Sequence, residues 1–477
     1  MTIVLKKPLE WKKANHEEQQ MLEALQGNIL KGHGRPETVN LFFRLDQAHA
    51  QAARRALREI GVHHLTSAYE QLLETDRFQQ DGESGKTFVA AFLSFTGYQA
   101  IGKTALAPTG EAVFHDGMKA ATSLDAVSDK LADWHEHFKE QIDGMVLVGD
   151  MVRNRVRLKR DEIAALLKEC GATIVHEQIG SAIKDKHDNG IEHFGYVDGR
   201  SQPLMLREDI EKESKDAGIA RWDPQFSLDV ALVKDMPGIA ADTTSFGSYF
   251  IFRKLEQRVR DFKLNEQLLA DKLKLKGAEP RERAGAQVVG RFEDGTPVTL
   301  SDEAKGLNPP NDFDYTGDAG LRCPFQAHIR KVNPRGSAAA ERKHIMPRRG
   351  IPFEDTLRVT HASDLPPAET LEKFKEDVMP LLPTGDVGLL FMAYNASLAQ
   401  QFVFTQASWA NSTTFPNTGA GVDPVIGQGA PAGIGPAWRE EWDEPASGVD
   451  TFDFNGFVTM RGGEYFFAPS LTFFKTL

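Results

Sequence analysis

The sequence predicts an α+β fold in which one architecture is duplicated, each copy being a sheet with helices on one face. The chain has 477 residues, more than one hydrophobic core usually supports, so two domains are expected. Apolar runs typical of strands alternate along it with segments of helical period. The second half repeats the opening order of helix and strand, although the two halves share no visible sequence identity. We place the domains at residues 1–225 and 226–477.

The expected elements follow one another without long gaps. In the first half, helices are expected at about 9–25, 47–60, 97–101 and 124–141, and strands at 39–45, 87–95, 144–148 and 173–178. In the second half, helices are expected within 255–273 and over 368–379, and strands at 246–252, 388–394, 401–405 and 456–459. Residues 419–436 are rich in Gly, Pro and Ala and predict an irregular loop.

Composition excludes several classes of protein. The chain is 41% hydrophobic and 26% charged, which is typical of a folded globular protein rather than a disordered one. Its formal net charge of −12 repels phosphate backbones, and no basic run with interleaved aromatics overrides this, so nucleic acid is not an expected partner. No stretch is long and apolar enough to cross a bilayer, so no membrane association is expected.

The use of cysteine and the N-terminal sequence indicate that the protein is located in the cytoplasm. Cys170 and Cys323 are far apart and form no Cys-x-x-Cys motif, so neither a disulfide framework nor a zinc site is predicted. The apolar run after Met1 is too short for a signal peptide, and no twin arginine precedes it. We expect the whole chain to be the mature protein and to stay in the cytoplasm.

Three short segments carry the chemistry, and they contain Asp198, His328 and Arg348. Taken singly, each has an ordinary structural explanation. The Asp198-Gly199 pair is typical of a turn, a single histidine is commonly structural, and the Arg348-Arg349 pair is typical of a solvated surface. Together they supply an imidazole that can bind iron, a carboxylate that can carry a proton and a permanent positive charge. Those are the groups that a peroxidase needs around one haem. Only one of the two adjacent arginines is expected to point inward.

The order of these segments resembles the dye-decolourising peroxidase family, specifically its long forms. The resemblance extends from about residue 20 to the C-terminus. It rests on Gly-x-x-Asp-Gly at 195–199, Ala-His-Ile-Arg-Lys-x-Asn-Pro-Arg at 327–335, Arg-x-Gly-Ile-Pro at 348–352 and quieter segments at 25–32, 247–255, 290–297 and 461–467.

This resemblance implies two ferredoxin-like domains, with a b-type haem held in the C-terminal domain. His328 matches the proximal iron ligand, Asp198 the distal acid and Arg348 the distal arginine, while Gly199 lets the backbone approach a flat ligand closely. Arg330 is a candidate partner for a haem propionate, although pairing with a surface carboxylate explains it equally well.

Three further expectations concern the hydrogen-bond partner of His328, the reaction and the residues that carry electrons to a buried haem. Asp386 is the candidate acceptor for the second ring proton of His328, unless it only closes a turn. The implied activity reduces hydrogen peroxide and oxidises bulky dyes, phenolics or other one-electron donors through a ferryl intermediate. Candidates for carrying electrons to a buried haem, which could equally be packing residues, are Trp409, Trp438, Trp442, Tyr394 and Tyr465. The alternative function is haem handling, that is storage or iron release with little turnover. The sequence does not indicate which oligomeric state the protein adopts.

Overall fold

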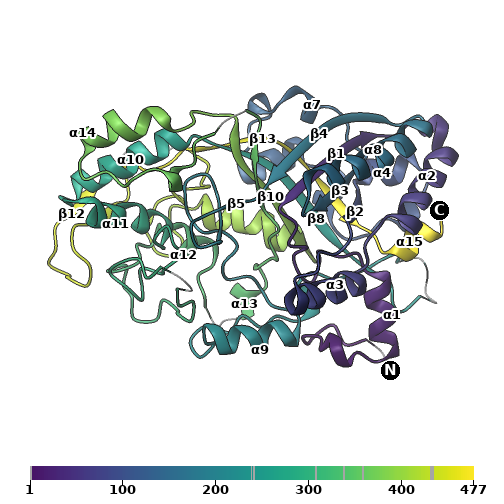
Figure 1. The fold of residues 1–477 in the computed structure, drawn as a ribbon, viewed down its shortest axis with the longest axis horizontal. Helices are drawn as coiled ribbons and strands as arrows, with labels where there is room; N and C mark the ends of the chain where they lie inside the picture. Colours follow the sequence, from purple (N-terminus) through teal and green to yellow (C-terminus); the bar gives the residue numbers. More distant parts are fainter. Residues whose placement is uncertain are drawn as a thin grey trace.

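One antiparallel sheet runs through the molecule (Figure 1). The computed structural model describes residues 3–237, 239, 242–306, 309–336, 339–356, 359–429 and 435–477. Within these residues the sheet has nine strands, in the order β4 (Thr173–Ser181), β1 (Glu37–Arg44), β3 (Gly144–Asp150), β2 (Phe88–Leu93), β13 (Val458–Ala468), β8 (Phe246–Gln257), β10 (Val387–Asn395) and β9 (Ile351–Glu354), with β7 (Val233–Lys234) beside β8. Two small ribbons pair β5 (Ile183–Lys184) with β6 (Gly190–Ile191) and β11 (Ala437–Arg439) with β12 (Val449–Thr451).

The sheet divides into two halves that follow the sequence. β1 to β4 come from the first half of the chain, and β7, β8, β9, β10 and β13 come from the second. The halves meet where β2 pairs with β13, at Leu93 and Phe467. This arrangement confirms the predicted α+β class. The boundary after residue 225 remains a prediction.

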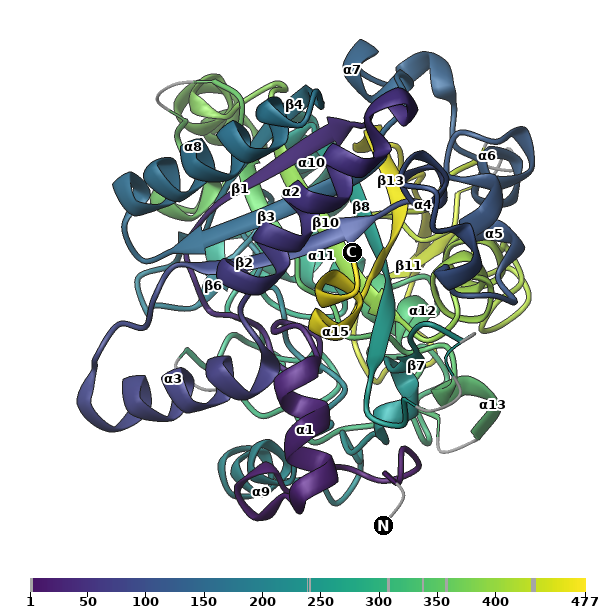
Figure 2. The same cartoon turned by 90° about the vertical axis from the view of Figure 1, so that its right-hand side faces the viewer.

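Helices pack around the sheet and beside it. They are α1 (His16–Ala24), α2 (Ala50–His63), α3 (Ala68–Asp81), α4 (Phe95–Ala100), α5 (Ala112–Asp116), α6 (Ala121–Val127), α7 (Glu136–Lys139), α8 (Arg153–Glu169), α9 (Arg207–Asp216), α10 (Val259–Lys272), α11 (Ala278–Val289), α12 (His328–Val332), α13 (Ala339–Arg342), α14 (Leu371–Lys373) and α15 (Leu471–Lys475). Figure 2 shows α2 and α8 lying over β1 and β3. In the second half, α10 packs against α11 and α14.

The buried strands explain why the sequence predicts them well. All seven residues of β3 are buried, because β1 and β2 flank it and α8 packs on it. Such a strand contains a continuous apolar run, here Met145 to Val148. In the part of the chain that the structure describes, no helix is long and apolar enough to cross a membrane.

Two expectations about local structure were wrong. Residues 401–405, expected as a strand, lie in consecutive π-helical segments, Ala399–Val403 and Thr405–Ala410. Their buried residues Gln401, Phe402, Thr405, Gln406 and Trp409 follow a helical spacing, which a five-residue window cannot separate from a strand. The helix expected over 124–141 is broken into α6, a 3₁₀ turn and α7.

Candidate active site

A large cavity brings the three chemistry-bearing residues together. Asp198, His328 and Arg348 all line it, with Gly199 beside Asp198. The cavity holds about 1780 Å³ of empty space, including the part that is open to solvent. Much of its wall is apolar and is formed by Val289, Ile329, Val332, Met346, Leu389, Phe391, Phe402, Val425, Ile426, Val458 and Met460.

His328 is the first residue of α12 and is fixed by a carboxylate. Its Nδ1 lies 2.9 Å from Oδ2 of Asp423, whose side chain is fully buried. The other carboxylate oxygen of Asp423, Oδ1, accepts hydrogen bonds from the backbone N–H groups of Val425 (2.8 Å) and Ile426 (3.0 Å). Among the described residues, Nε2 of His328 has no hydrogen-bond partner, and 25% of the side chain is exposed. The ring is therefore held at one nitrogen, which leaves the other free in the cavity.

The pKa values of this pair reflect their contact. Burial opposes protonation of His328, but the charge and hydrogen bond of Asp423 outweigh it and raise the pKa of the imidazole. Burial likewise opposes ionisation of Asp423. His328 and the two backbone N–H groups outweigh it and lower the pKa of that carboxyl. The pair thus strongly favours a negative charge on Asp423 beside the ring.

The expectation that Asp386 accepts the second ring proton was wrong, because Asp423 occupies that position. Asp386 closes the turn before β10 in a left-handed conformation with φ of 60°, and its carbonyl accepts a hydrogen bond from the Asp355 N–H at 2.8 Å. That is the turn alternative considered above.

Lys331 ties α12 to the loop that carries Asp423. Its side chain is fully buried, and Nζ donates hydrogen bonds of 2.7 Å each to the carbonyl oxygens of Ser412, Phe415 and Gly421. The backbone N–H of Asp423 also donates to Ala410 O at 2.8 Å. These contacts fix the position of Asp423 relative to His328, three residues before Lys331.

Asp198 lies in a loop that backbone hydrogen bonds fix at Asp198 and at the residue before it. Its N–H donates to Gly190 O at 3.0 Å, and the preceding Val197 N–H donates to Glu293 O at 2.9 Å. The Asp198 side chain makes no hydrogen bond to any described residue. Gly199 has φ of 78°, and a side chain there would meet nothing within 4 Å. The loop therefore presents a free carboxylate to the cavity next to open space.

Arg348 and Arg349 point in different directions. The segment that contains both arginines runs antiparallel to β10. Arg348 forms a β-bridge with Ala393, and the Arg349 N–H donates to Met392 O at 2.7 Å. Successive side chains of an extended segment alternate in direction. Arg348 lines the cavity, with Nη2 donating to Arg200 O at 2.9 Å. Burial lowers its pKa, and Asp198 opposes that shift.

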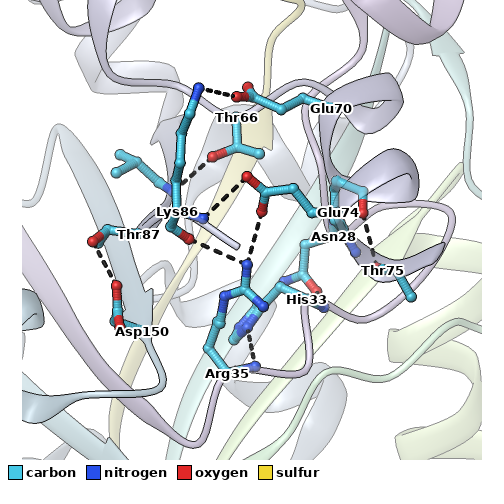
Figure 3. Close-up of polar contacts among 12 residues, drawn as sticks. Asn28, His33, Arg35, Thr66, Glu70, Glu74, Thr75, Lys86, Thr87 and Asp150 are labelled. Carbon is cyan, nitrogen blue, oxygen red and sulfur yellow. Dashed lines mark hydrogen bonds and ion pairs between the residues drawn. The ribbon is translucent and has the colours of Figure 1, made fainter. Parts of the chain in front are cut away.

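Arg349 instead anchors the N-terminal segment. Its Nε donates to Asn28 O at 2.7 Å and its Nη2 to Ile29 O at 2.9 Å. Asn28 and His33 belong to a polar network that includes the Arg35–Glu74 ion pair (Figure 3). The inward arginine is thus Arg348.

Arg330 does not reach the cavity. Its guanidinium donates to the carboxylate of Asp318 at 3.2 Å and to Cys323 O at 2.5 Å. It follows His328 by two residues on α12, and positions two apart lie on opposite sides of a helix. The expectation that it contacts a cofactor was therefore wrong, and the carboxylate-partner alternative describes it.

Three other arginines, Arg200, Arg291 and Arg335, line the cavity without a counter-charge. Arg291 and Arg335 converge on Asn311 Oδ1, at 2.8 and 2.9 Å, and on Ser201 Oγ. Within the described residues, the hydrogen bonds of these three guanidinium groups go to carbonyl, amide and hydroxyl oxygens and not to a carboxylate. Burial and the charge of Arg335 lower the pKa of Arg291 to about 9, and burial lowers that of Arg335 to about 10. The site thus fits a flat apolar ligand that carries negative groups at its edge.

Four of the five aromatic candidates for electron transfer are buried. They are Trp409, Trp438, Tyr394 and Tyr465. Trp442 is partly exposed and lies between the guanidinium groups of Arg283 and Arg322, 4.7 and 5.4 Å from its ring.

Comparison with known proteins identifies relatives over the whole chain. The chain is 43% identical to the multifunctional dye peroxidase DyP2 of Amycolatopsis sp., with full coverage of both proteins. The solved structure of DyP2 superposes with a TM-score of 0.89 at 41% identity, again with full coverage. A DyP-type peroxidase of Anabaena sp. superposes at 0.87 with 34% identity and covers 98% of this chain and 97% of its own. A dye-decolourising peroxidase solved in complex with 2,6-dimethoxyphenol superposes at 0.73 with 27% identity, covering 95% and 98%. No family model matches the chain.

The relatives and the fold place this enzyme among the haem peroxidases. The chain belongs to the dye-decolourising peroxidase family, whose two-domain ferredoxin-like fold it shares. These findings confirm the predicted fold class and peroxidase function, and they do not favour the haem-handling alternative.

Proposed function

We propose that the cavity binds haem b and that His328, Asp198 and Arg348 perform peroxide chemistry on it. The observation that carries this assignment is the His328–Asp423 hydrogen bond of 2.9 Å, which leaves Nε2 free in an apolar cavity. A ligating histidine commonly donates its other ring N–H to a carboxylate, which strengthens its electron donation. Nε2 of His328 would bind the haem iron, and Asp423 would orient the ring.

The cavity supports a non-covalently bound haem. Neither Cys170 nor Cys323 lines it, and the chain has no Cys-x-x-Cys-His motif for covalent attachment. Arg291 and Arg335 would neutralise the carboxylates at the edge of the haem, since both are buried guanidinium groups without a carboxylate partner among the described residues. When bound, haem supplies the iron centre at which the peroxide bond is cleaved.

Asp198 and Arg348 have separate tasks in this proposal. The carboxylate of Asp198 would accept a proton from one oxygen of hydrogen peroxide and donate it to the other. General acid–base transfer of this kind contributes roughly 100- to 10,000-fold. The guanidinium of Arg348 supplies a fixed positive charge beside the departing oxygen, and a preorganised donor contributes about 100- to 1,000-fold.

The reducing substrates are proposed to be dyes and phenols. Support comes from the names of the relatives and from the relative solved with 2,6-dimethoxyphenol. A bulky donor cannot enter the cavity, so it would give its electron to an accessible aromatic residue. We assign this task to Trp442, because the other four candidates are buried.

We also propose a cytoplasmic location and no nucleic-acid partner. Both cysteines are free and buried, which suits a reducing compartment. The net charge of −12 disfavours phosphate backbones.

Haem reconstitution with peroxide titration tests the proposal. Haem-loaded wild-type protein should show a Soret band that changes within milliseconds to seconds of adding hydrogen peroxide, and it should then oxidise an anthraquinone dye. His328→Ala should bind haem weakly and show little of this response. A loaded wild-type protein whose spectrum ignores peroxide would contradict the assignment.

A further inference from the structure

A second cluster of metal-ligating side chains lies outside the cavity. It consists of His193, Glu354 and His361, and one ligand atom from each lies within 4.8 Å of the others. None of the three lines the cavity. They come from separate segments: His193 precedes the Asp198 loop, Glu354 ends β9, and His361 caps a 3₁₀ turn, Ala362–Asp364.

His193 is an unusual core residue, because one of its ring nitrogens has nothing to bind. The residue is only 2% exposed, and its Nε2 lies 3.0 Å from Phe353 O. A carbonyl oxygen can only accept, so Nε2 must carry the proton and Nδ1 must carry a lone pair. Among the described residues no group hydrogen-bonds to this buried Nδ1. Leaving a buried acceptor unpaired is unfavourable, because the group has lost its hydrogen bonds to water.

This arrangement is what a metal-ligating histidine requires. Donation from the second ring nitrogen to a backbone carbonyl fixes the tautomer and aims the free lone pair. Burial and the neighbouring His361 lower the pKa of His193 to about 4, so the ring is neutral at ordinary pH. A neutral ring can bind a cation without first losing a proton.

The other two residues complete a mixed nitrogen and oxygen donor set. His361 Nε2 lies 2.7 Å from Glu354 Oε1, and its Nδ1 lies 3.6 Å from Asp364 Oδ2. An ion pair between His361 and Glu354 explains that contact alone, but it leaves the lone pair of His193 unpaired. A cation between the three residues would use all of these groups, with Asp364 supporting His361 from its far side.

We propose that His193, Glu354 and His361 bind one divalent transition-metal ion of the zinc type. Two imidazoles and one carboxylate are ligands typical of Zn²⁺, with a fourth position left for water. The ion would join the segment leading to Asp198, five residues after His193, to the end of β9, six residues after Arg348. Its effect would therefore be to hold together the two segments that carry the proposed distal groups.

Zinc binding by the full-length, haem-loaded protein tests this site. After chelator treatment, equilibrium dialysis against Zn²⁺ with elemental analysis should give one zinc per chain in addition to the haem iron. Zinc binding should weaken roughly 100-fold or more in each of the variants His361→Gln, Glu354→Gln and His193→Gln. Loss of a metal ligand should weaken binding at least as much as loss of a residue that hydrogen-bonds to a ligand. Zinc should also raise the melting temperature of the wild type but not that of His361→Gln.

His49→Gln is the matched control. His49 Nδ1 lies 2.9 Å from Asp46 Oδ2 in an exposed pair that has no third ligand. This variant should bind zinc as the wild type does. The side chain of His361 is 26% exposed, so His361→Gln decides the question if His193→Gln fails to fold. The proposal is contradicted if the wild type binds no zinc, or if His361→Gln binds it as tightly as the wild type. Haem binding, measured by the Soret band, should be unchanged in His361→Gln because His361 does not line the cavity, and this separates the zinc test from that of the haem site.

Discussion

Nδ1 of His328 and Oδ2 of Asp423 lie 2.9 Å apart, although 95 residues separate them along the chain. Asp423→Asn should disturb this contact. Only one side-chain oxygen remains in asparagine, so it cannot serve both the backbone N–H groups of Val425 and Ile426 and the ring N–H of His328. Haem affinity or turnover should fall roughly 10- to 100-fold, measured by haem titration and steady-state dye oxidation.

Asp386→Asn is the control for that change. Asp386 has φ of 60°, a conformation that asparagine also tolerates, and it does not contact His328. This variant should keep wild-type haem affinity and activity. Equal losses in Asp386→Asn and Asp423→Asn would contradict the role given to Asp423.

Arg335→Gln should weaken haem binding roughly 10- to 100-fold, because a hydrogen bond to a charged group contributes about 1.5 to 3 kcal/mol. Titration of the apoprotein with haem measures this change. Arg342→Gln is a fair comparison, because Arg342 stacks on the same Trp222 ring, at 5.1 Å against 5.4 Å for Arg335, without lining the cavity. Similar haem affinities in the two variants would contradict the proposal that Arg335 pairs with the carboxylates of the haem.

Lys331→Met should lower the free energy of unfolding by at least about 2 kcal/mol, because it removes the buried donor that three partly buried carbonyl groups share. Urea denaturation followed by fluorescence and by the Soret band measures the loss. The exposed Lys305→Met should change stability by less than about 0.5 kcal/mol. A Lys331 variant as stable as the wild type would show that the loop holding Asp423 does not depend on this contact.

His33 should make the protein sensitive to acid. Burial, followed by the charges of Arg35 and Arg349, lowers its pKa from 6.5 to about 3. Between pH 6.5 and about pH 3 the imidazole binds a proton in the unfolded chain but not in the folded one. The contribution of His33 to the free energy of unfolding is therefore fully present above pH 6.5 and is lost as the pH falls below it. Between pH 7 and pH 5 the wild type should lose roughly 1 to 2 kcal/mol more than His33→Asn.

Urea denaturation at the two pH values measures that difference. Asparagine at position 33 can keep an acceptor for the Arg35 N–H, which His33 Nδ1 accepts at 3.0 Å, but it loses the stack on Phe88 at every pH. The comparison therefore concerns the change with pH, not the absolute stability. His63→Asn, at an exposed histidine, should retain the wild-type pH dependence. Parallel pH profiles for His33→Asn and the wild type would refute the effect.

The fold was predictable where a segment carried a long, consistent pattern. β3 contains an apolar run at Met145 to Val148 and β10 one at Leu389 to Ala393, and both lie where strands were expected. The helical character of residues 401–405 was missed because a short apolar run, Phe402 to Phe404, fits a strand as well as a helix. Helix α8 was not anticipated. Its many charged side chains weaken the apolar stripe on Val156, Ile163 and Leu167 that a helix prediction needs.

Residues of the candidate site could be predicted only where they lie in a sequence motif of the family. Asp198, His328 and Arg348 do, and all three line one cavity. Asp423 lies in the Gly- and Pro-rich loop, where no periodicity indicates direction, so only the folded chain brings it to His328. Arg335 lies beyond the end of α12, so helical spacing from His328 could not have indicated it, and only the folded chain brings it to Asn311 beside Arg291.

Stopped-flow mixing of haem-loaded protein with hydrogen peroxide tests the central claim most directly. The Asp198 side chain makes no hydrogen bond to any described residue, so Asp198→Asn should leave the fold and the Soret band intact. The rate constant of the spectral response should fall about 100- to 10,000-fold in Asp198→Asn, and about 100- to 1,000-fold in Arg348→Leu. A wild-type rate constant in Asp198→Asn would contradict the proposal that this carboxylate moves the peroxide proton.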